Sequence, residues 1–199
     1  MLLATKFEEI KPPSSNDFAY ISDATYTPRQ IARMEMKICT HLKFNIRGVT
    51  PMMFFHRFIR ASQEGDSKPQ NELLEKVCLY ILELSFLEYQ FVGVKSSLLM
   101  ASTLYLARAT LGIRSLGFWK RGKEGYPPKR VGQFWSPTLE FYTGYDIWAL
   151  EYTVKLLHKL QYSVGARKDE LNSAFNKYKS SKFLRASLKT AVNYEDLGF

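Results

Sequence analysis

The sequence predicts an all-α fold, and three observations support this prediction. Apolar residues recur at helical spacing, as in Leu74, Val77, Ile81 and Leu84. Three pairs of a hydroxyl residue followed by proline suit helix N-termini, where the hydroxyl caps the first turn and proline fits the first helical position. These pairs are Thr27-Pro28, Thr50-Pro51 and Ser136-Pro137. The alternation of apolar and polar residues that is typical of β-strands does not extend over a strand-length segment.

The first 48 residues predict three helical segments. Met1 to Ile10 suits the last turns of a helix, and Lys11-Pro12-Pro13 stops it. Asn16 to Ile21 suits one or two helical turns. A longer helix is expected from Thr27 to Phe44, with Gln30 at the capping-box position. Its apolar stripe is formed by Ile31, Met34, Ile38 and Leu42.

The rest of the chain predicts five further helices and a C-terminal region. The five helices open at Thr50, Asn71, Val94, Ser136 and Asp146. The third is apolar on all sides, which is typical of a central helix buried by its neighbours. A loop rich in Gly, Pro and Tyr is expected at 113–135, a polar helix at Asp169 to Ser181, and a weakly patterned tail after it.

Composition excludes several classes of protein. With 199 residues, 46% of them hydrophobic, the chain can bury a core of one domain or two small ones. A membrane-spanning run is missing, and the first residues turn acidic too soon for a signal peptide. The two cysteines and three histidines are spaced for neither a disulfide framework nor a metal site. We therefore expect no cofactor, no membrane partner, and a reducing compartment.

One pair of charged residues stands out near the N-terminus. Glu35 lies on or beside the apolar stripe, where a buried carboxylate would need a cation, and Lys6 ends the short helical segment MLLATK. Helix geometry alone favours an internal structural pair, because most such pairs are structural.

Three motifs in this region resemble a known family. They are L-L-A-T-K-F-E-E-I-x-P-P from Leu2, F-x-Y-I-S-D-x-T-Y-T from Phe18, and R-M-E at Arg33. Together they are similar to the second half of the first cyclin box of A- and B-type mitotic cyclins. Near the other end, Lys177-Tyr178-Lys179-Ser180-Ser181-Lys182-Phe183 resembles the K-Y-K-x-S-K-F/Y run that closes these cyclins.

The resemblance implies a partial first five-helix repeat followed by a complete second one. It places the end of the first box at 1–48, the second box at 49–165, and a C-terminal helix and tail at 166–199. It also implies a cyclin-dependent protein kinase as partner, in the nucleus and the cytoplasm. The residues that would contact the kinase are Lys6 and Glu35, which would bind its backbone, and the apolar Leu3, Phe7, Cys39, Phe44 and Ile46. The family prefers a larger aliphatic residue where Cys39 stands.

The sequence shows no paired nucleophile and base, no phosphate-binding loop and no metal cluster. We therefore predict a non-catalytic regulator. The formal charge of +9 is densest in the loop, at Lys120, Arg121, Lys123, Lys129 and Arg130. These residues suit a solvated insertion, or alternatively a nuclear-import patch. Two other functions stay open. One is a transcription-type cyclin-fold protein that binds DNA, although nucleic acid is the less favoured partner, and the other is a truncated cyclin fragment that does not activate a kinase.

Overall fold

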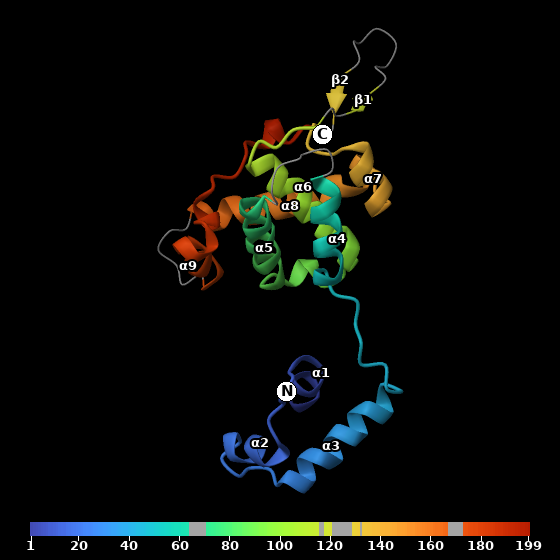
Figure 1. Ribbon diagram of the computed structural model, residues 1–199, viewed down its shortest axis with the longest axis vertical. Helices are drawn as coiled ribbons and strands as arrows, with labels where there is room; N and C mark the ends of the chain where they lie inside the picture. The colour runs from blue at the N-terminus through green and yellow to red at the C-terminus, as the bar shows by residue number, and fades with distance from the viewer. Residues whose placement is uncertain (64–70, 116–117, 121–128, 132, 167–172) are drawn as a thin grey trace. The chain divides into compact units, whose positions relative to one another are not determined.

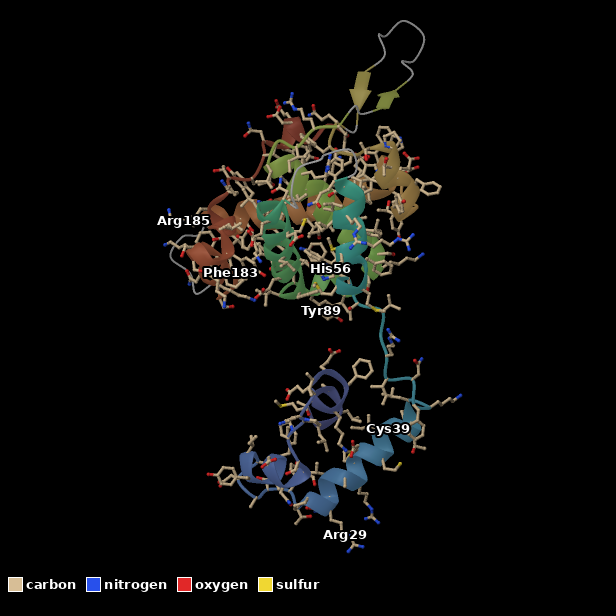
Figure 2. The ribbon with its side chains drawn as sticks, viewed as in Figure 1. Arg29, Cys39, His56, Tyr89, Phe183 and Arg185 are labelled. Carbon is tan, nitrogen blue, oxygen red and sulfur yellow. The ribbon has the colours of Figure 1, made fainter. Side chains whose placement is uncertain are left out.

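The computed structural model describes residues 1–63, 71–115, 118–120, 129–131, 133–166 and 173–199, of which 118–120 and 129–131 are described for their backbone alone. The chain forms two compact units, Met1–Gly48 and Val49–Phe199. Figure 1 labels the helices and strands of both units. Each unit is described by itself below.

The first unit contains three helices, α1 (Leu2–Glu8), α2 (Ser15–Ile21) and α3 (Pro28–His41). A capping box opens α3, because the Thr27 hydroxyl accepts a hydrogen bond from the Gln30 amide while the Gln30 side chain accepts one from the Thr27 amide. Ser14 and Asp17 form the same arrangement at α2. The predicted start of α3 is therefore confirmed, and its hydroxyl-proline pair serves as a cap.

Helix α3 ends at His41, earlier than the expected Phe44. Lys43 and Phe44 adopt left-handed backbone conformations, with φ of 50° and 58°. The Phe44 amide donates to the Cys39 carbonyl at 2.8 Å, and the Lys43 amide donates to the Thr40 carbonyl at 3.0 Å. These bonds satisfy carbonyl groups of the last helical turn in the manner of a Schellman motif. Phe44 therefore lies in a tight turn after the helix.

The second unit is built around α6 (Ser96–Thr110), in which every residue from Leu99 to Ala109 is buried. Figure 1 shows α6 among the other helices of this unit, and it packs against α4 (Met52–Ser62), α5 (Glu72–Phe86) and α8 (Ile147–Ala166). Helix α7 (Pro137–Thr143) packs on α4. The five predicted helices, and the central position of the third, are confirmed.

Two large buried side chains of this core donate hydrogen bonds to backbone carbonyl groups of other segments. Buried Arg108 donates from Nε to the Phe134 carbonyl at 2.8 Å and from Nη1 to the Ser62 carbonyl at 2.9 Å. Trp135 is fully buried, and its Nε1 donates to the Tyr145 carbonyl at 3.1 Å. The expected loop 113–135 therefore ends inside the core. That part of the expectation is corrected, because Phe134 and Trp135 pack around Tyr105 of the central helix.

The expected loop also contains two short strands, β1 (Phe118–Lys120) and β2 (Lys129–Val131). They pair antiparallel, with Trp119 opposite Arg130 and Lys120 opposite Lys129. At the base of this segment the Ser115 amide donates to the Gln133 carbonyl at 2.7 Å. These three-residue strands do not change the all-α class of the fold.

We expect the loop beyond that base to contribute little to stability. Replacing residues 116–132 by a short Gly/Ser turn should change the free energy of unfolding of the second unit by less than about 1 kcal/mol, as is usual for changes away from packed features. Urea denaturation of the loop-deleted and intact chains measures this difference. A loss of several kcal/mol would show that Phe118, Trp119 or Tyr126 belongs to the core.

The C-terminal region packs closely on the second unit, although its sequence is weakly patterned. It contains α9 (Ser173–Lys179) and the 3₁₀ turns η2 (Ser181–Phe183), η3 (Ala186–Leu188) and η4 (Tyr194–Leu197). Elsewhere in this unit, the 3₁₀ turn η1 (Tyr89–Phe91) follows α5. Tyr105 donates its hydroxyl to the Leu197 carbonyl at 2.6 Å, and Phe199 stacks on the Tyr105 ring. His158 Nε2 lies 2.6 Å from the Val192 carbonyl oxygen. The tail is therefore an ordered part of this unit.

Candidate functional site

Lys6 and Glu35 meet in the first unit, as the sequence predicted. The Lys6 ammonium donates to both carboxylate oxygens of Glu35, at 2.7 and 2.9 Å. Helix α1 supplies the lysine and α3 the glutamate, so the ion pair joins two helices through residues that are 29 positions apart in the sequence. The bidentate contact holds both charges in a fixed position.

This ion pair lies at the surface, which corrects the expectation of a buried carboxylate. The Lys6 side chain is 48% exposed and that of Glu35 is 20% exposed. An exposed pair of this kind stabilises a fold by only about 0–1 kcal/mol. The lysine has donor capacity beyond its two bonds to Glu35, because an ammonium group carries three protons. Both groups can therefore reach polar groups of a partner.

Apolar residues of the candidate site are also exposed within the first unit. Phe7 follows the lysine and is 55% exposed, while Phe44 is 67% and Ile46 is 39% exposed. Leu3 is half-buried. Exposed large apolar side chains are typical of protein-binding surfaces, because aromatic groups contribute strongly to association when they are covered.

Cys39 differs from the other site residues because it is buried, with 7% of its surface exposed. Its carbonyl accepts the Phe44 amide, so this residue helps to set the turn after α3. The structure gives Cys39 a packing role within the unit. Its expected contact with a kinase stays a prediction.

A groove of about 800 Å³ lies beside the ion pair. Leu3, Glu35 and Ile38 line it, with Phe18 of α2 and Arg33 and Lys37 on α3. Phe7, Phe44 and Ile46 are not among the lining residues. Two of the residues expected in the apolar stripe of α3, Met34 and Ile38, are 53% and 40% exposed. The groove was not predicted from the sequence, although the apolar stripe of α3 was the signal that could have indicated it.

The basic residues of the loop are only partly described. The backbone of β1 includes Lys120, and that of β2 includes Lys129 and Arg130. Arg121 and Lys123 lie outside the described residues. That these five side chains form a basic patch stays a prediction.

The described part of the chain carries neither a metal-binding cluster nor a membrane-spanning helix. Within it, no three residues among the His, Cys, Asp and Glu side chains lie close enough together to hold a metal ion. Within the same residues, no helix combines the length and the apolar character needed to cross a bilayer.

Comparison with known proteins identifies the family. A family model described as "Cyclin, C-terminal domain" matches residues 49–191, and one described as "Cyclin, N-terminal domain" matches residues 1–47. The first match covers well over half of the chain. The chain belongs to the cyclin family, and its fold is the cyclin fold, with a partial first helical repeat followed by a complete second one.

Individual relatives are A-type and B-type cyclins. Cyclin-A2-1 of Arabidopsis thaliana is 34% identical over 96% of this chain and 39% of the relative. Cyclin-A3-1 of Oryza sativa subsp. japonica is 36% identical over 92% of this chain and 44% of the relative. G2/mitotic-specific cyclin-B of Drosophila melanogaster is 31% identical over 96% of this chain and 33% of the relative. The chain thus spans less than half the length of these relatives.

Proposed function

We propose that this chain is a non-catalytic regulatory subunit that binds a cyclin-dependent protein kinase and promotes its active conformation in the mitotic cell cycle. The observation that carries the proposal is the surface position of the Lys6–Glu35 pair, with its bidentate contact and partial exposure. An ion pair that served only the fold would contribute little to its stability at such an exposed position. Similarity to cyclins that include a G2/mitotic-specific B-type protein supports the same function.

The mechanism that we propose is a shift of the kinase population. A protein kinase is active only when its own Lys–Glu ion pair and its magnesium-binding aspartate are both in place. A subunit that binds this arrangement more tightly than others moves the equilibrium toward it by its difference in affinity. Lys6 and Glu35 would bind backbone groups of the kinase, while Phe7, Phe44 and Ile46 would pack under its mobile helix. The kinase would supply all of the phosphoryl-transfer chemistry.

Binding and activation are tested together on purified proteins. The full chain, immobilised through a tag, is mixed with a purified cyclin-dependent kinase, and the retained kinase is assayed with a peptide substrate. Retention with increased phosphorylation is the expected result. Retention without activation would indicate a binding fragment, and the failure of several such kinases to bind would contradict the proposal. DNA binding that falls steeply with added salt would favour the transcription-type alternative instead.

We also propose that the protein works in the nucleus and the cytoplasm. The sequence basis for this proposal is the group of basic residues between Lys120 and Arg130. Exchange of these residues for serine should then reduce the nuclear fraction of a fluorescently tagged chain.

A further inference from the structure

The outer face of α8 carries three exposed aromatic residues and two lysines that are not part of the candidate site. We call this set the α8 stripe: Trp148, Tyr152, Lys155, Lys159 and Tyr162. Their spacing alternates between four and three residues, so they fall within an arc of about 80° on the helix and extend for roughly 21 Å. The opposite face is buried through Leu150, Val154 and Leu157.

The aromatic members of the α8 stripe are open to solvent. Tyr152 is 73% exposed, Tyr162 is 66% exposed and Trp148 is 43% exposed. Tyrosine and tryptophan contribute most to protein association when a partner covers them. Alternating spacing of four and three residues is also the pattern by which two helices pack along a common seam. The stripe therefore matches an α-helical partner in both composition and geometry.

The charges of the α8 stripe restrict what that partner can be. Its lysines are Lys155, which is half-buried, donates to Glu151 at 2.6 Å and lies over the Tyr194 ring, and Lys159, which is exposed. A second copy packed antiparallel on the same stripe would place lysines opposite lysines, and this repulsion disfavours a homodimer. The partner helix should instead carry carboxylates opposite these lysines.

A nucleic acid fits the α8 stripe less well, because carboxylates lie beside it. Glu151 is in α8 itself, and Tyr194 of η4 contacts the helix, with its ring 5.9 Å from that of His158 and 5.7 Å from the Lys155 ammonium. Glu195 and Asp196 are exposed in the same turn as Tyr194. A phosphate backbone would meet these charges along its length, whereas a helix with one or two carboxylates would not.

We propose that the α8 stripe is a docking surface for an amphipathic helix of another protein. Aliphatic residues of that helix would cover Tyr152, Trp148 and Tyr162, and its central acidic residues would face Lys155 and Lys159. This surface belongs to the second unit, whereas Lys6 and Glu35 belong to the first. A kinase and the helical partner would therefore bind through different residues.

A designed peptide tests the proposal directly. The probe is a fluorescein-labelled helix of about 18 residues, with leucine at the seam positions and glutamate at the two central ones. Its binding to the full chain is followed by fluorescence anisotropy. A matched peptide has lysine in place of both glutamates. We expect the glutamate peptide to bind at least about tenfold more tightly than the lysine peptide.

Variants of the chain then locate the binding surface. Tyr152→Ser should weaken binding of the glutamate peptide by about tenfold or more, and Lys159→Glu should shift the preference toward the lysine peptide. Tyr89→Ser and Lys182→Glu, at other exposed positions, serve as controls and should change nothing. Circular dichroism confirms that each variant is folded. Absence of binding at millimolar peptide, or binding that Tyr152→Ser and Lys159→Glu leave unchanged, would overturn the proposal.

Discussion

Replacement of Lys6 or Glu35 by alanine should abolish kinase binding while the protein stays folded. Because the ion pair is exposed, its loss should lower the free energy of unfolding of the first unit by less than about 1 kcal/mol. The effect on binding should be far larger, because removal of one charge leaves polar groups at the kinase interface without a partner. Kinase retention and activity, measured beside thermal melts, separate the two effects.

Three further variants sharpen this test. Lys6→Arg keeps the charge but changes the donor geometry, so we expect an intermediate loss of binding. Lys11→Ala and Glu9→Ala are matched controls at exposed positions in the same unit, and should bind the kinase normally. Stable Lys6→Ala and Glu35→Ala proteins that still activate the kinase would contradict the proposed site. The ion pair would then be a structural feature of the first unit.

Truncation of Trp135 should cause a large loss of stability in the second unit. The side chain is fully buried against Tyr105, and its Nε1 donates to the Tyr145 carbonyl. We expect Trp135→Ala to lower the free energy of unfolding by about 3–5 kcal/mol, since it leaves a large cavity and an unpaired carbonyl. Urea denaturation followed by far-ultraviolet circular dichroism measures the change.

A surface aromatic provides the matched comparison. Phe141 is 82% exposed, and Phe141→Ala should change stability by no more than about 0.5 kcal/mol. Trp135→Phe, which keeps an aromatic ring, should fall between the two. If Trp135→Ala were as stable as Phe141→Ala, the inclusion of residues 134–135 in the core would be wrong.

The helices could be predicted where the sequence carried capping residues and regular apolar spacing. Thr27 and Gln30 indicated the start of α3, and the apolar run around Leu104 indicated the central helix. The end of α3 was predicted wrongly, because the turn uses left-handed Lys43 and Phe44 without the glycine that usually marks it. Helix starts depend on local side-chain chemistry, whereas this helix end depends on a backbone conformation with no clear sequence signal.

Irregular segments were the hardest to predict. Leu197 is buried and the Val192 carbonyl contacts His158, yet the 3₁₀ turns of the tail have no periodicity that could reveal this packing. Trp135 was assigned to the end of a loop because Gly, Pro and charged residues surround it. The Lys6–Glu35 contact was predicted correctly, but the internal position that helix geometry alone favoured was wrong, because burial depends on which helices cover α3.

The two cysteines allow each unit to be followed separately. Cys39 lies in the first unit and Cys78 in the second, and both are free thiols that are buried. Burial raises the pKa of the Cys78 thiol well above its usual range, so little reactive thiolate forms while the second unit is closed. An alkylating reagent should therefore modify each cysteine only as fast as its own unit opens. Labelling rates at the two positions report the opening of the partial first repeat and of the complete second repeat independently.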